Sequence, residues 1–197
     1  MSAPPPDVSA TLTGRLLVAT PMLADGTFDR SVVLLLDHDE EGALGVVVNK
    51  ATPVEVATVL PSWQPYVSDP GVLFQGGPVA LDSALGLAVL RADATVEPAA
   101  WRRVTGRLGL VDLDADPLDV VAAFESVRVF AGYSGWSAGQ LEAELAEGAW
   151  YVVSAAGGDE FSDAFSLRPD GMWRAVLRRQ GGDLAMVSTY PDDPSLN

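Results

Sequence analysis

The most restrictive feature of this 197-residue sequence is a pair of apolar runs within residues 28–49, FDRSVVLLLDHDEEGALGVVVN. The runs cover residues 32–36 and 43–49, and an acidic, glycine-containing turn lies between them. Two leucine-rich or β-branched runs on either side of such a turn predict a β-hairpin. Because both runs are continuous rather than alternating, we expect other elements to cover the hairpin on both faces.

The overall composition excludes several kinds of site. The chain has no cysteine, so disulfides, thiolate metal ligands and cysteine nucleophiles are ruled out. Twenty-seven acidic and twelve basic residues give a formal net charge of −15 at pH 7. A protein this acidic repels nucleic-acid phosphates at long range, which argues against direct nucleic-acid binding.

Length and terminal sequences indicate the domain organisation. We expect a single domain over residues 11–190, a disordered, proline-rich tail at residues 1–10 and a C-terminal tail at residues 191–197. The N-terminus lacks the positive start and apolar segment of a secretory signal, and no apolar run reaches membrane-spanning length. These features favour a cytoplasmic protein that makes no membrane contact.

Local signals predict both helices and strands. Capping and proline signals predict three helices, which begin near Thr52-Pro53, Asp116-Pro117 and Ser137. A fourth, amphipathic helix is predicted around residues 172–179, and a short strand is expected at residues 184–188. Strand and helix signals that follow one another along the chain indicate mixed α and β content.

Five motifs recur in the order and spacing of a known family: GRLLVATP at residues 14–21, FDRSVV at 28–33, HDEEGALGVVVN at 38–49, GGPV at 76–79 and GYSGWSAGQLEAE at 132–144. Together they resemble the AlgH/YqgE family of bacterial proteins. The resemblance implies an α+β fold with a mixed, largely antiparallel, barrel-like β-sheet and helices packed around it. The family's name refers to a proposed role in regulating alginate synthesis, and the resemblance assigns no catalytic residue.

His38 is the only histidine, so a Ser-His-Asp triad or a histidine-ligated metal would have to use it. Its neighbours Asp37, Asp39, Glu40 and Glu41 could bind a hard cation or raise the basicity of the imidazole. Adjacent residues on one turn seldom converge on a metal, however, and acidic turns are usually solvated. We therefore expect no metal site at this turn.

A glycine pair ahead of a proline, Gly76-Gly77-Pro78, forms the first candidate ligand site. Glycine can adopt positive φ, so backbone N–H groups in this turn could hold a phosphate or carboxylate, with Arg30 as a cationic partner. The turn has neither the Walker lysine nor the spaced Rossmann glycines. The alternative, a tight structural turn, is the reading that the pattern favours.

A second candidate site is the glycine-rich loop before the predicted helix at Ser137. It combines polar and aromatic side chains that could hold an anionic ligand or a peptide at a helix N-terminus, namely Tyr133, Ser134, Trp136, Ser137 and Gln140. In the alternative interpretation, Tyr133 and Trp136 fill the core and Ser137 only caps the helix.

The predicted amphipathic helix carries Arg174, Arg178 and Arg179, which could contact nucleic acid. No helix-turn-helix, finger or ribbon motif accompanies them. We expect these arginines to form a solvated face opposite the apolar residues of the helix.

These observations favour a non-catalytic regulatory or binding module that acts through a protein or a small anionic ligand and uses no cofactor. The sequence has no catalytic constellation with diagnostic spacing. Two alternatives remain open. One is an enzyme whose site joins the Gly76-Gly77 turn to residues 133–140 and uses Ser134 or Tyr133. The other is a DNA-binding transcriptional regulator.

Overall fold

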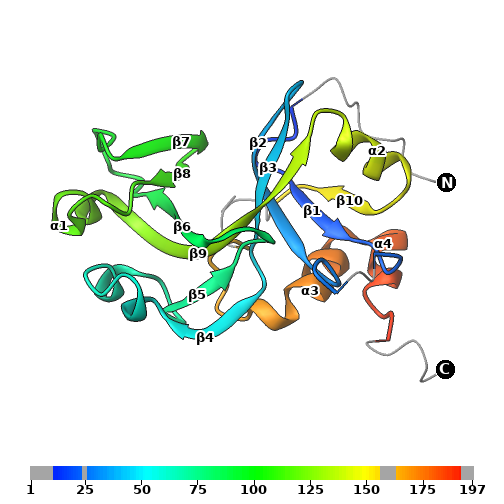
Figure 1. Cartoon of the computed structure of the whole chain (residues 1–197). Coiled ribbons are helices and arrows are strands. Elements are labelled where there is room, and N and C mark those ends of the chain that lie inside the picture. The colour runs from blue at the N-terminus through cyan, green and yellow to red at the C-terminus, as the bar shows by residue number, and fades with distance from the viewer. Residues whose placement is uncertain (1–10, 24–25, 156–162, 192–197) are drawn as a thin grey trace.

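A computed structural model describes residues 11–23, 26–155 and 163–191 of the chain. Its main element is a ten-stranded sheet that curls into a half-barrel, with short helices packed against it (Figure 1). All strand pairs are antiparallel except one. The predicted α+β class with a largely antiparallel, barrel-like sheet is therefore confirmed. Apart from Pro191, the two predicted tails lie outside the described residues.

The elements follow one another in a mainly β order. The strands are β1 (Leu16–Ala19), β2 (Val32–Asp39), β3 (Gly42–Val47), β4 (Ala51–Glu55), β5 (Val72–Gln75), β6 (Val79–Leu90), β7 (Trp101–Thr105), β8 (Leu108–Val111), β9 (Phe124–Ser137) and β10 (Trp150–Val153). The α-helices are α1 (Pro117–Val120), α2 (Gln140–Ala146), α3 (Met172–Gln180) and α4 (Gly182–Val187). Along the sheet the order is β10-β1-β2-β3-β9-β6-β8-β7, and β4 pairs with β5.

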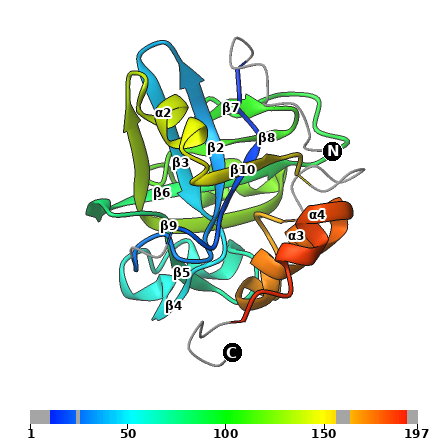
Figure 2. The same ribbon diagram turned by 90° about the vertical axis from the view of Figure 1, so that its right-hand side faces the viewer.

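The predicted hairpin is formed by β2 and β3, and both of its faces are buried. Val32, Leu34 and Leu36 point into the cluster inside the curled sheet, which we call the inner cluster. Val33 and Leu35 belong to a second cluster on the other face, which we call the α2 cluster. Helix α2 lies over this side of the sheet (Figure 2). The continuous apolar run therefore has the cause we inferred, because alternate side chains serve two different cores.

A third apolar cluster covers the outer face of β6 and β8. It includes Trp63, Ala88, Trp101 and Val129, and the α1 region packs over it. The indole N–H of Trp63 donates to the carbonyl of Leu113 at 2.9 Å, which fastens the covering segment to the end of β8. The sheet is thus sandwiched between one inner core and two outer ones.

Strand β9 connects the two halves of the sheet. One edge pairs with β6 from Phe124 to Tyr133. The other edge pairs first with β5 in parallel, where Phe74 lies opposite Phe130, and then with β3, where Gly45 lies opposite Ser134. A single 14-residue strand therefore fixes the positions of β3, β5 and β6 relative to one another.

Arg128 of β9 is a buried cation that donates to backbone carbonyls. Arg128 is 1% exposed. Its guanidinium donates to the carbonyls of Ala164 at 2.9 Å, Ser166 at 3.3 Å and Asp69 at 2.5 Å. The guanidinium also lies 4.2 Å from the ring centroid of Phe74. Burial lowers the pKa of Arg128 to about 10, so it stays charged at neutral pH. Arg128 thereby ties two loops to the central strand.

Two local predictions were wrong. The segment at Thr52-Pro53 is strand β4 rather than a helix, because it pairs with β5, where the Thr52 hydroxyl donates to the carbonyl of Leu73. Residues 182–187 form helix α4 rather than a strand. The helix at Asp116 is confirmed, with the Asp116 carboxylate accepting from the backbone N–H of Leu118 at 3.0 Å.

Helix α3 confirms the predicted amphipathic helix. Met172, Trp173, Val176 and Leu177 are buried against the inner cluster. Among the described residues, no helix combines the length and apolarity that crossing a membrane would require.

Replacing Arg128 with methionine tests its role as a tie between loops. The change keeps much of the side-chain volume but leaves three carbonyls without their donor, so we expect the free energy of unfolding to fall by about 2–4 kcal/mol. Urea unfolding followed by circular dichroism measures this. Arg91→Met, at an exposed arginine, is the matched control and should change stability by less than about 0.5 kcal/mol. Equal stability of the two variants would contradict the role.

Candidate functional site

The Gly76-Gly77 turn lies directly against the backbone of β9. A Cβ atom on Gly77 would come within 2.3 Å of the carbonyl carbon of Tyr133, and one on Gly76 within 2.4 Å of the carbonyl oxygen of Gly132. Gly77 also has a φ of +153°, and Gly132 a φ of +69°. Only glycine satisfies both the close approach and this backbone conformation. The structure therefore brings Gly76 and Gly77 together with Tyr133, in a packed contact between two backbone segments.

Ser134 completes this contact from the side of β9. It is 0% exposed, and its hydroxyl donates to the carbonyl of Gly76 at 3.1 Å. The same carbonyl accepts the backbone N–H of Val47 at 2.8 Å. The Ser134 hydroxyl is thus held inside the protein by a hydrogen bond that joins β9 to the turn, and Tyr133 is only partly buried.

The remaining loop residues belong to a second network, which we call the indole clamp: Trp136, Ser137, Gln140, Glu144 and Trp150. One carboxylate oxygen of Glu144, Oε2, accepts both indole N–H groups, from Trp136 and Trp150, at 2.8 Å each. The other oxygen accepts the Gln140 amide at 3.0 Å. Gln140 in turn accepts the backbone N–H of Ser137 at 3.1 Å, the half of the predicted capping box that forms. The clamp fastens α2 to β9 and β10.

Arg30 lies in a third place. Its guanidinium stacks 4.8 Å from the ring centroid of Trp173 on α3 and donates to the carbonyls of Tyr190 and Pro191. Its backbone is fixed by Asn49, whose side-chain amide donates to the Arg30 carbonyl at 2.9 Å. Arg30 therefore contacts the C-terminal helical region through its side chain.

His38 uses both ring nitrogens within the protein. Nδ1 lies 3.0 Å from the backbone nitrogen of Leu12, and Nε2 lies 2.9 Å from a carboxylate oxygen of Glu142 on α2. The hydrogen bond with His38 lowers the pKa of Glu142. Within the described ranges, no group of three or more histidine or acidic side chains could hold a metal ion.

The helix α3 arginines also make internal contacts. Arg179 forms a two-pronged ion pair with Asp163, both distances being 2.6 Å, and Arg174 donates to the carbonyl of Ser188 at 2.6 Å. Arg178 is exposed. The expected solvated face is therefore only partly formed.

A cavity of about 330 Å³ opens on the outer face of β6 and β8. Its walls combine leucine side chains with a short acidic loop, and the lining residues are Leu60, Ala84, Leu85, Gly86, Leu110, Val111, Asp112, Leu113 and Asp114. None of the eight residues selected from the sequence lines this cavity.

A sequence model of the AlgH-like family matches residues 16–185. This chain belongs to the AlgH-like family. A UPF0301 protein of Streptomyces avermitilis is 61% identical over 190 residues, which cover 95% of this chain and 96% of that protein. A UPF0301 protein of Streptomyces coelicolor is 62% identical, with the same two coverages. Neither name states an activity.

Solved structures agree with this AlgH-like assignment. A crystal structure from Corynebacterium diphtheriae has a TM-score of 0.82 and 33% identity, and the match covers 96% of this chain and 94% of that one. The solution structure of the AlgH protein from Pseudomonas aeruginosa has a TM-score of 0.69 and 28% identity, over 98% of this chain and all of that one. The resemblance stated from the motifs is therefore confirmed.

Sequence reasoning missed Glu144 and Glu142 of this AlgH-like chain. Glu144 lies four residues after Gln140, the spacing at which helical side chains meet, and that spacing was the available signal. The partner of Glu142, by contrast, is His38, which is 104 residues away in the sequence. No local pattern reveals such a pair.

Replacing Glu144 with alanine tests the indole clamp. Two indole N–H groups would lose their acceptor, so we expect the free energy of unfolding to fall by about 2–4 kcal/mol. Urea unfolding monitored by tryptophan fluorescence measures it. Glu147→Ala, at an exposed glutamate beside the same helix, should change stability by less than about 0.5 kcal/mol. A clamp without structural importance would give the same small change in both variants.

Proposed function

We propose that this AlgH-like protein is a non-catalytic binding module and that a protein partner docks at the start of β6. The proposal rests on the first residues of β6, which bulge away from β9 and expose apolar side chains. Between Val79, opposite Tyr133, and Ala84, opposite Ala131, the register of β6 against β9 shifts. Four residues of β6 thus face a single residue of β9. We call residues 79–83 the β6 projection.

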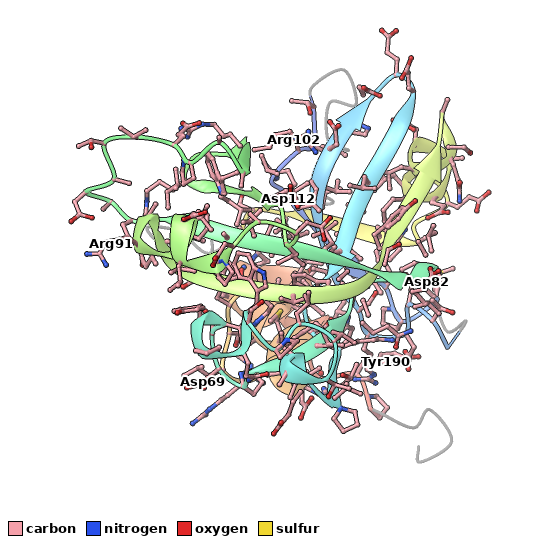
Figure 3. All side chains as sticks on the ribbon, turned by 60° about the vertical axis from the view of Figure 1, so that its left-hand side comes forward. Asp69, Asp82, Arg91, Arg102, Asp112 and Tyr190 are labelled. Carbon is pink, nitrogen blue, oxygen red and sulfur yellow. The ribbon has the colours of Figure 1, made fainter. Side chains whose placement is uncertain are left out.

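The β6 projection presents leucine and valine side chains to solvent. Leu81 is 56% exposed and Val79 is 38% exposed. Asp82 lies at the outer edge of the molecule, where β6 begins (Figure 3). Exposed apolar side chains that are held on a rigid base are typical of protein interaction sites.

The base of the β6 projection is unusually constrained. Ala80 has a φ of +49°, and the preceding Gly76-Gly77 turn packs on Gly132 with no room for side chains. The terminal side-chain carbon of Leu81 also lies against Gly132. A segment fixed this tightly loses little conformational entropy on binding, which favours affinity.

The polar candidates support binding rather than catalysis. The hydroxyl of Ser134 is buried and already donates to a carbonyl, and both nitrogens of His38 have partners. A nucleophile and a base that act together need to lie within hydrogen-bond reach of each other. Backbone atoms of Tyr133 also fill the space beside Gly77, which argues against a small anion in that turn.

The cavity beside the β6 projection indicates the character of the partner. Ala84 and Leu85 of β6 continue directly from the projection into the cavity, whose rim carries the exposed Asp112 and Asp114. With the chain's formal charge of −15, this surface suits a partner that is apolar at its centre and basic around it.

Replacing Leu81 with serine tests the proposal by affinity capture from native lysate with quantitative mass spectrometry. We expect at least one protein to be retained by the wild type and reduced about tenfold or more by Leu81→Ser, since buried apolar anchors dominate interface energies. Leu118→Ser is the matched control, because Leu118 is 70% exposed on α1 and outside the projection. Retention of the same proteins by all three forms would refute docking at the β6 projection.

A further inference from the structure

The tautomer of neutral His38 is fixed by the two groups that face its ring nitrogens, the Leu12 N–H and the Glu142 carboxylate. A backbone N–H can only donate, so Nδ1 must accept from Leu12 and carries no proton. The single ring proton of the neutral imidazole is therefore on Nε2, where it donates to Glu142. His38 is 8% exposed, and its hydrogen bond with the Leu12 N–H is buried.

The Leu12 contact fastens the first described segment of the chain. The hydroxyl of Thr11 donates to the carbonyl of His38 at 3.0 Å, and Leu12 is 5% exposed in the α2 cluster. Two residues later, the backbone N–H of Gly14 donates to the carbonyl of Leu35 at 2.8 Å. The segment is thus held along β2 by hydrogen bonds, of which one depends on the state of the imidazole.

A second proton on His38 would conflict with that contact. The imidazolium ion carries N–H groups on both nitrogens, so Nδ1–H would point at the N–H of Leu12 across 3.0 Å. Two facing donors repel each other, and the buried Leu12 N–H would lose its acceptor. The hydrogen bond to Glu142, in contrast, would gain an opposite charge and strengthen.

Several acidic residues lie near His38 in the sequence or in the fold. Its own strand contributes Asp37 and Asp39, the turn that follows contributes two glutamates, and α2 contributes Glu142. The facing residue of β3 is Ala43, and the N-terminal segment brings the uncharged Thr11 and Leu12. Since the hydrogen bond from His38 lowers the pKa of Glu142, this carboxylate stays ionised while imidazoles gain their proton.

We propose that His38 is a proton-controlled latch, which holds residues 11–15 against β2 while the imidazole is neutral and releases them when it becomes imidazolium. A second proton on Nδ1 would remove the acceptor of the Leu12 N–H. Docking of the segment is therefore complete at high pH and is lost as the pH falls. Release would uncover the edge of the α2 cluster that Leu12 covers.

Nuclear magnetic resonance of the full chain between pH 8 and pH 5 tests the latch. At pH 8 we expect Nδ1 of His38 to be the unprotonated nitrogen. The protection factor of the Leu12 amide should then fall tenfold for each pH unit on the acid side of the transition, because opening takes up one proton. The amide of Val47, which donates to Gly76 in the core, should keep its protection and so exclude global unfolding.

His38→Asn is the matched control, since the asparagine oxygen can accept from Leu12 near the position of Nδ1 but does not titrate. Its Leu12 amide should stay protected across the same pH range. A proton on Nδ1 at pH 8 would overturn the latch. So would Leu12 protection in the wild type that does not change with pH, or a similar loss of protection in His38→Asn.

Discussion

The arrangement of the whole sheet depends on one contact between backbones, where Gly76 and Gly77 cross Gly132 and Tyr133. At this point β5 ends, β6 begins, and β9 exchanges β5 for β3 as its neighbour. The carbonyl of Gly76 accepts from both Val47 and Ser134, so a single peptide unit connects β3 and β9. Any side chain larger than a hydrogen would separate the strands at the place where all of them meet.

The polar residues of the family motifs also serve to hold the fold together. Ser134, Gln140 and Glu144 form hydrogen bonds within the protein, and His38 bonds to Leu12 and Glu142. These residues determine how β9, α2 and the N-terminal segment are held together. The β6 projection, by contrast, exposes Val79 and Leu81 beside an acidic rim, which is the basis of the proposed binding role.

Much of the fold was accessible from the sequence where a local pattern had a single explanation. The continuous run at residues 32–36 predicted a strand buried on both faces, and the hairpin and amphipathic α3 followed from turn and periodicity signals. The helix predicted at Thr52-Pro53 was wrong because this segment pairs with β5 as strand β4. The capping pattern is local, whereas this pairing exists only in the folded sheet. The candidate loop residues lie in hydrogen-bond networks whose partners, such as Glu144, were not identified from the sequence.

The missing partners share a physical reason. Arg128 is an isolated cation in an apolar strand, and its acceptors come from loops about 36 and 59 residues away in sequence. The register shift that creates the β6 projection arises from packing on Gly132, and residues 79–83 themselves give no signal of it. Local patterns specify elements, whereas long-range hydrogen bonds and close backbone approach decide which of their side chains stay exposed.

The indole clamp gives the protein a built-in optical reporter. The rings of Trp136 and Trp150 lie 6.0 Å apart, at 78° to each other, with both N–H groups on one carboxylate. Indoles this close couple their ultraviolet transitions, which produces a circular dichroism signal that isolated tryptophans lack. Because one indole belongs to β9, the other to β10 and the carboxylate to α2, that signal reports whether the helix is seated, without any label.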